Sequence, residues 1–303
     1  MNVLYSARYH IDIGPHVFPT RKYQLVHARL LQAGIVRPDD VREPRAATWD
    51  ELALVHTAEY LQAMREGTLS AEAVAQLELP WSAEMVDGFR LMTGGTIEAA
   101  LLACGVESPI AVHIGGGLHH AFPNHGEGFC PFNDVAVAVR VLQQRGLSRA
   151  AIVDLDVHHG NGTAFIFESD PRVFTFSMHQ QHNYPMWKPR GSLDVGVPDG
   201  TGDAAFLDQL DRALPGVLTH RPECVFYLAG ADPYEDDQLG GLHLTKDGLR
   251  RRDRMVIEAV RGAALPLVIC LAGGYARRVE DTVDIHVATI EEALKNQDFV
   301  AAE

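Results

Sequence analysis

The sequence is poor in cysteine, has no long apolar run and carries no excess of basic residues. It has 4 cysteines among 303 residues, and no two of them are spaced as CxxC, so they indicate neither a disulfide framework nor a zinc knuckle. No apolar run approaches the length of a membrane span. The N-terminal residues also lack the charged and then apolar layout of a signal peptide. We therefore expect a cytoplasmic protein with no membrane partner.

The charge balance is acidic, with 40 aspartates and glutamates against 26 lysines and arginines and a net charge of −14. Binding to nucleic acid needs a basic face, so this balance disfavours DNA or RNA as a partner. It is compatible with cationic substrates such as lysine side chains or polyamines.

Short apolar runs alternate with helical patterns along most of the chain. The runs predicted to be strands are residues 2–5, 109–114, 150–155, 173–177, 224–228 and 265–271. The helical patterns cover residues 22–31, 51–65, 82–103, 133–144, 162–168, 204–218, 245–263 and 279–294. We expect the third of these helices to kink or break at Thr93-Gly-Gly-Thr96, because glycine weakens a helix.

This alternation predicts an α/β fold with three layers, in which a mainly parallel central sheet has helices on both faces. The chain shows no internal repeat, and no stretch is rich enough in proline, glycine or serine to act as a linker. We therefore expect residues 1–303 to form a single domain.

A patterned polar segment follows the run 150–155. Asp154, Asp156 and His158 recur at every second residue, so on an extended backbone their side chains point to the same side. Two carboxylates and an imidazole at the end of a buried strand are unfavourable without a cation, which predicts a divalent metal. Asp232 ends another run, after Ala229-Gly-Ala, and completes a three-ligand set with Asp156 and His158. The alternative is a capped strand end with solvated acids.

Two further strand ends carry candidate catalytic residues. His119 and His120 follow three glycines, and Tyr275 follows two. Ligands bind outside the carboxyl ends of the strands in open α/β sheets, so we expect these residues at the same rim as the metal ligands. Beside a metal, one histidine would take a proton from water and the tyrosine hydroxyl would donate to an oxyanion. The alternative is one buried and one exposed histidine beside a packing tyrosine.

Five motifs occur in a specific order: GGGLHHAF (115–122), GFCPFND (128–134), DLDVHHGNG (154–162), AGAD (229–232) and AGGY (272–275). This ordered set resembles the zinc-dependent histone deacetylase family of the arginase/deacetylase superfamily. Features at residues 18–23, 55–61, 93–96 and 184–185 resemble the class IV branch and its bacterial members. Over nearly the whole chain, the resemblance implies the arginase/deacetylase fold and a bound Zn²⁺ or Fe²⁺.

The resemblance also implies individual roles. The residues that match the zinc ligands are Asp156, His158 and Asp232. His120 matches the general base that later acts as an acid, and His119 matches its electrostatic partner.

The surrounding positions match as well. Asp154 and Asn161 match the groups that hydrogen-bond to His119 and His120, and Tyr275 matches the tyrosine that stabilises the transition state. The walls that flank a lysine stem match Gly128, Phe129 and Tyr184. A structural K⁺ bound by main-chain oxygens matches the region of Asp154, Asp156, His158, Ser177 and Met178. Asn161 departs from class I members, which have aspartate there; an amide orients His120 but does not stabilise its imidazolium as a carboxylate would.

The expected activity is metal-dependent hydrolysis of an Nε-acyl-lysine amide, with acylated lysine in a peptide or protein as the partner. The alternatives are an acetylpolyamine amidohydrolase, an arginase-like binuclear hydrolase and a non-catalytic scaffold that binds acyl-lysine.

The class IV features favour long acyl chains over acetyl, which requires an apolar cavity beyond the metal. The candidate wall residues of this cavity are Tyr9, Ile11, Ile13, Phe122, Pro123 and Phe132. The competing hypothesis is a short pocket closed by bulky side chains.

Overall fold

The computed structural model describes residues 1–105 and 108–297 and is built around one parallel sheet. The strands in the order of the sheet are β2 (Val41–Arg42), β1 (Asn2–Leu4), β3 (Ile110–His113), β8 (Leu267–Cys270), β7 (Cys224–Leu228), β4 (Ala150–Asp154), β5 (Val173–Gln180) and β6 (Leu193–Val197). All seven neighbouring pairs are parallel. The four inner strands β3, β8, β7 and β4 are buried along their whole length, as expected for strands covered on both faces.

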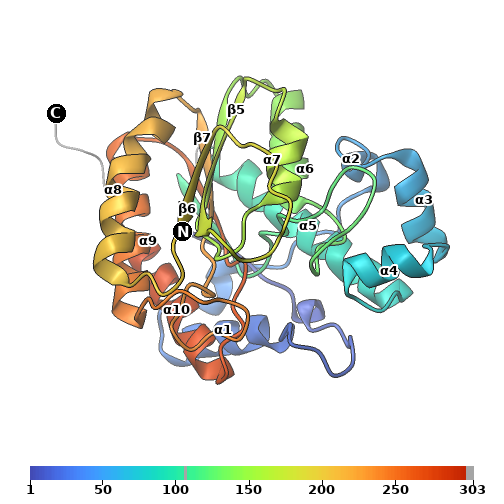
Figure 1. Ribbon diagram of the computed structural model, residues 1–303, viewed down its shortest axis with the longest axis horizontal. Helices are drawn as coiled ribbons and strands as arrows, with labels where there is room; N and C mark the ends of the chain where they lie inside the picture. Colours follow the sequence, from blue (N-terminus) through green and yellow to red (C-terminus); the bar gives the residue numbers. More distant parts are fainter. Residues whose placement is uncertain (106–107, 298–303) are drawn as a thin grey trace.

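Helices cover both faces of the sheet (Figure 1). One layer contains α1 (Arg21–Gln32), α8 (Asp203–Thr219), α9 (Lys246–Gly262) and α10 (Val279–Lys295). The other layer contains α5 (Ala83–Ala103), α6 (Asp134–Gln144) and α7 (Asn161–Phe167). Three short helices extend away from the sheet beside α5: α2 (Trp49–Leu52), α3 (Ala58–Glu66) and α4 (Ala71–Leu77). The predicted three-layer α/β fold is confirmed.

The carboxyl ends of the central strands lie at the same level. Asp154 at the end of β4 pairs in register with Leu228 of β7. Leu228 pairs with Cys270 of β8, and Cys270 pairs with His113 of β3. The loops that follow these four strands therefore begin side by side at one edge of the sheet.

Several local predictions were wrong. The pattern at residues 51–65 is two helices, because α2 ends at Leu52 and Thr57 begins α3 by accepting a hydrogen bond from the Tyr60 amide. The helix α4 and the two outermost strands, β2 and β6, were not predicted from the sequence. Half-buried and exposed residues alternate from Leu193 to Gly196 in β6, and the exposed ones include Asp194, so its sequence lacks an apolar run. Among the described residues, no helix is long and apolar enough to cross a membrane.

The predicted break in the helix at residues 93–96 is also wrong, because α5 runs without interruption from Ala83 to Ala103. Its glycines serve close packing instead. A Cβ on Gly94 would lie 1.8 Å from the carbonyl oxygen of Arg45, and a Cβ on Gly95 would lie 2.4 Å from His113 Nε2. The backbone of the buried helix thus touches neighbouring segments where any side chain would collide.

We predict that Gly94→Ala lowers the free energy of unfolding by roughly 1–3 kcal/mol, the usual cost of overpacking. Gly216 in α8 provides the control, because a Cβ there meets its nearest neighbour, Leu193 Cδ2, at 3.6 Å. Gly216→Ala should raise the free energy of unfolding by roughly 0.5–1 kcal/mol, as expected for a helix interior. Denaturant titrations would measure both, and two equal shifts would contradict the packing argument.

Candidate active site

Three acidic and histidine side chains converge beyond the carboxyl ends of β4 and β7. Ligand atoms of Asp156, His158 and Asp232 lie within 4.8 Å of one another, and all three residues are buried. His158 Nδ1 is 3.0 Å from Asp156 Oδ1 and 3.4 Å from Asp232 Oδ2. Asp232 Oδ2 is buried and has no hydrogen-bond partner within the described chain. The structure thus brings together the predicted metal-ligand set.

The chemistry of this cluster fits a divalent cation. Burial, followed by the charge of Asp156, raises the pKa of Asp232 to about 7. Burial alone would lower the pKa of His158, but the adjacent carboxylates raise it to about 10. In the absence of a metal the cluster therefore retains protons, which a cation would displace. A Cβ on Gly273 would lie 2.0 Å from Asp232 Oδ2, so glycine is required beside the ligand atoms.

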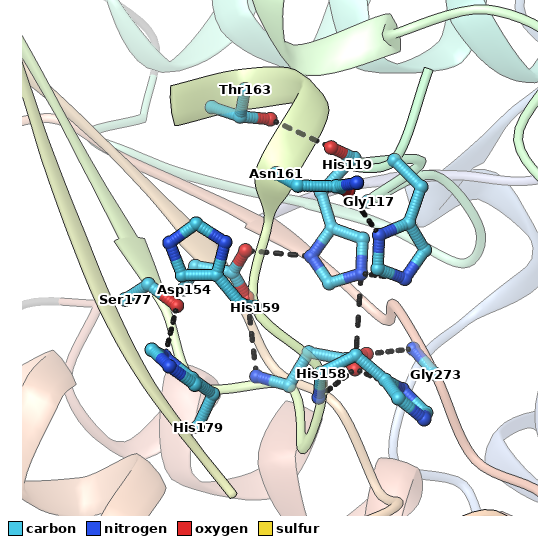
Figure 2. A network of polar contacts seen from close by, with 12 residues as sticks. Gly117, His119, Asp154, His158, His159, Asn161, Thr163, Ser177, His179 and Gly273 are labelled. Atoms are coloured by element: carbon cyan, nitrogen blue, oxygen red, sulfur yellow. Dashed lines mark hydrogen bonds and ion pairs between the residues drawn. The ribbon is translucent and has the colours of Figure 1, made fainter. Parts of the chain in front are cut away.

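His119 and His120 lie next to this cluster, and their side chains meet. His119 Nε2 is 3.1 Å from His120 Nε2. His119 Nδ1 is 2.6 Å from Asp154 Oδ2 (Figure 2). His120 Nδ1 is 2.7 Å from Asn161 Oδ1. The preceding loop makes this possible because Gly116 has a φ of 72°, in the left-handed region that favours glycine.

The two histidines have opposite pKa shifts. Burial alone would lower the pKa of His119, but the carboxylates of Asp154 and Asp156 raise it to about 9. Burial and the positive charges of His119 and His158 hold the pKa of His120 well below 6.5. At neutral pH the pair is therefore one cation and one neutral imidazole, and only His120 has a nitrogen free to accept a proton.

A pocket of about 190 Å³ opens onto these residues. Its lining is Glu78, His120, Gly128, Phe129, His158, Asn183, Tyr184, Leu239 and Tyr275. The ring of Tyr184 packs edge-on against His120 at 5.0 Å, and a Cβ on Gly128 would lie 2.8 Å from His120 Cδ2. The predicted walls Gly128, Phe129 and Tyr184 thus line the same channel as His120, His158 and Tyr275.

Comparisons with known proteins identify the family of this chain. The family model described as the histone deacetylase domain matches residues 16–290. An uncharacterized protein of Picosynechococcus sp. is 45% identical over 273 residues, covering 89% of this chain and 90% of that protein. Histone deacetylase 2 of Arabidopsis thaliana is 32% identical over 303 residues, covering 94% of this chain and 78% of that protein. The crystal structure of the HDA15 HD domain matches with a TM-score of 0.83 at 26% identity, covering 99% of this chain and 90% of the other.

The chain belongs to the histone deacetylase family. The family resemblance predicted from the five ordered motifs is confirmed, and the fold matches that of a deacetylase domain.

In this histone deacetylase domain, a second and smaller cavity continues inward from the channel. Its volume is about 20 Å³, and it shares His120, Gly128, Phe129 and Tyr275 with the channel. The residues that close it include Phe18, Tyr23, Leu118, Cys130, Ala272 and Gly273. The wall residues expected from the sequence are wrong: Tyr9, Ile11, Ile13, Phe122, Pro123 and Phe132 are all described, and none lines this cavity.

Two further residues shape the site: Lys22, known from the sequence only as part of the feature at residues 18–23, and Glu127, which was not predicted as a site residue. Lys22 is fully buried, donates from Nζ to the carbonyl oxygen of Ala272 at 2.8 Å and lies 5.5 Å from the ring centre of Tyr275. Burial lowers the pKa of Lys22 to about 8, against the attraction of the nearby aspartates. Glu127 accepts hydrogen bonds from Asn161 Nδ2 and from the Tyr184 hydroxyl, both at 2.8 Å. The contact with Glu127 leaves the amide oxygen of Asn161 facing His120.

A second group of ligand-type residues, His113, Asp134 and Cys270, is also buried within 4.8 Å. The hydroxyl of Thr96 lies among them, 2.9 Å from His113 Nδ1, 3.8 Å from Cys270 Sγ and in a short contact with Asp134. Asp134 also accepts from the Leu118 amide at 2.7 Å. Since the hydroxyl occupies the centre, this group is a hydrogen-bonded support for the loop before His119 and does not resemble a metal site.

We predict that Asp156→Ala or Asp232→Ala removes bound metal and activity together, because the remaining ligands do not restore the charge balance. The control is Cys270→Ala in the second group, which should retain wild-type metal content. Elemental analysis of the purified proteins measures this. A ligand variant with stoichiometric metal and wild-type turnover would remove that residue from the set.

Proposed function

We propose that this chain is a metal-dependent lysine deacetylase that hydrolyses the amide of Nε-acetyl-lysine within a single catalytic domain. The observation that carries the proposal is the channel of about 190 Å³, whose inner end is formed by His120, His158 and Tyr275 together. A divalent ion, Zn²⁺ or Fe²⁺, held by Asp156, His158 and Asp232 would polarise the acetyl carbonyl and acidify water.

The histidine pair supports general acid–base catalysis. His120 accepts a proton from the attacking water, since burial and the positive charge of His119 keep its ring neutral. Asn161 fixes the ring because its Oδ1 accepts a hydrogen bond from His120 Nδ1. His120 then returns the proton to the leaving lysine amine. His119, held by Asp154, keeps a positive charge beside it.

Tyr275 supports stabilisation of the oxyanion. Burial, followed by the charges of Asp156 and Asp232, raises the pKa of its phenol well above 10. The hydroxyl therefore stays protonated and can donate a hydrogen bond. A donor fixed in advance near the reacting carbonyl stabilises the charge that develops there.

The inner cavity supports acetyl as the preferred acyl group. A volume of about 20 Å³ is close to what one water-sized group needs, so it accommodates the acetyl methyl group. A longer acyl chain would have to displace the buried Phe18 and Tyr23. We therefore replace the long-chain hypothesis from the sequence with the short-pocket hypothesis.

An acetylpolyamine amidohydrolase is the second candidate, because the carboxylate-bearing residue Glu78 lines the channel and would favour a cationic amine.

We also propose a structural K⁺ beside β4 and β5. The register pairing of Asp154 with Ser177 on the adjacent strand supports this proposal, because it brings two of the expected main-chain ligands close together.

We predict that Tyr275→Phe reduces kcat on an acetyl-lysine peptide by roughly 10²–10³-fold with little change in KM, as when one oxyanion donor is removed. Tyr234 is outside the channel lining, so Tyr234→Phe is the control and should keep the wild-type kcat and KM. If Tyr275→Phe raises KM and leaves kcat unchanged, Tyr275 is a wall of the channel and the oxyanion needs another donor.

A second test compares kcat/KM on one peptide that bears acetyl, octanoyl or myristoyl lysine, with acetylputrescine as the polyamine probe. We expect a steady fall from acetyl to myristoyl, since the inner cavity has no room for added methylenes. A rise with chain length would contradict the short pocket. A higher kcat/KM on acetylputrescine than on every peptide would favour the polyamine function, and hydrolysis of none of them would favour a binding scaffold.

A further inference from the structure

The backbone of Tyr275 is fixed by a loop from a distant part of the chain. The Tyr275 amide donates to Asp237 Oδ2 at 2.7 Å. Its carbonyl oxygen accepts from Gln238 Nε2 at 2.8 Å and from the Gln238 amide at 3.2 Å. Both polar groups of the Tyr275 backbone are therefore held by two consecutive residues.

Tyr275 needs such support because its own segment provides little. It lies outside the helices and strands, and Gly274 before it has a φ of 144°, a conformation that glycine adopts without strain. The ring packs at 6.3 Å from Phe18 and 6.0 Å from Phe129. These contacts hold the ring, whereas the position of the backbone depends on the loop that contains Asp237.

Asp237 is itself held rigidly. Its side chain is buried, with 6% of the residue exposed. Oδ1 accepts from the amides of Leu239 at 2.8 Å and Gly240 at 3.1 Å, so with Tyr275 the carboxylate satisfies three amides. Burying a carboxylate is costly unless several donors satisfy it, and this one is outside the proposed metal-ligand set. Two of its hydrogen bonds close its own loop, and the third joins that loop to Tyr275.

We propose that Asp237 is a positioning residue that acts through Tyr275, an inference that rests on the proposed deacetylase function. An oxyanion donor is effective only when it is held within a fraction of an ångström of its target, and an error of about 1 Å costs as much as 10²-fold in rate. Asp237 supplies that constraint on the backbone of the tyrosine.

The test uses zinc-loaded protein and an acetyl-lysine peptide. Asp237→Asn keeps the shape of the side chain but turns one acceptor into an N–H donor that faces an amide. We expect kcat to fall roughly 10- to 100-fold with KM and zinc content unchanged. The matched control is Asp236→Asn, because the adjacent Asp236 is half exposed and pairs only with Arg277 at 3.3 Å; it should behave as the wild type.

A double-mutant cycle separates positioning from a general structural effect. In the Tyr275→Phe background, Asp237→Asn should cost less than about threefold in kcat, because the hydroxyl that it positions is absent. A further loss as large as in the wild-type background would overturn the proposal. Loss of zinc from Asp237→Asn, or a wild-type kcat, would also overturn it.

Two measurements keep the proposal testable if Asp237→Asn folds poorly. Gln238 is exposed, so Gln238→Ala should fold and should reduce kcat by a few fold; an unchanged kcat would count against the proposal. In fluorotyrosine-labelled protein, the fluorine NMR signal assigned to Tyr275 should shift or broaden in Asp237→Asn and in Gln238→Ala. It should not change in Asp236→Asn. A wild-type protein that hydrolyses no acetyl-lysine peptide would instead overturn the proposed function, whereas an active wild type with unaffected variants would overturn this inference alone.

Discussion

The burial of two carboxylates side by side is the constraint on which the rest of this structure depends. Asp156 and Asp232 are 2% and 0% exposed, and uncompensated charges at such positions cost several kcal/mol each. A cation between them offsets that cost, provided that the two loops that carry the carboxylates stay in place. The fully buried Arg252 on α9 holds these two loops together. Its Nη1 donates to the carbonyl oxygens of Leu155 at 3.2 Å and Gly230 at 2.6 Å, which precede Asp156 and Asp232 in the chain by one and two residues. One guanidinium thus ties together the two loops that bring the carboxylates face to face.

The charges around this cluster also separate the pKa values of the adjacent histidines His119 and His120. Both are buried and their rings touch, so the difference between them comes from their partners. His119 is held by the carboxylate of Asp154 and stays protonated, whereas His120 is held by the amide of Asn161 and stays neutral. A carboxylate at position 161 would favour the proton on His120 and reduce this difference. Glu127 affects His120 indirectly. It accepts a hydrogen bond from the Asn161 amide and so orients that amide toward the His120 ring.

The sequence predicts well those features that are encoded by neighbouring residues. The alternation of Asp154, Asp156 and His158 follows from strand geometry, and the apolar runs place the inner strands of the sheet. Contacts between segments that are distant in the sequence could not be predicted in this way. Nothing near Asp237 in the sequence indicates that it binds the amide of Tyr275, 38 residues away. The glycines of α5 show the same limit, since their purpose depends on which backbone approaches the helix. Helix propensity predicted a break there, and tertiary packing overrode it.

The depth of the inner cavity illustrates why pocket volume is hard to infer from motifs. The cavity is closed by Phe18 and Tyr23. Both belong to a feature seen in the sequence at residues 18–23, but the motif does not show how far their side chains reach into the cavity. Burying one more methylene of an acyl chain would gain about 0.8 kcal/mol. Making room for it would force buried aromatic rings out of a packed core, which typically costs about 1–3 kcal/mol. Tyr23 is also one of three rings around the Lys22 ammonium, with Phe18 and Tyr275. Opening the cavity would therefore disturb the surroundings of a buried cation as well, and this link between acyl size and electrostatics favours the shortest acyl group.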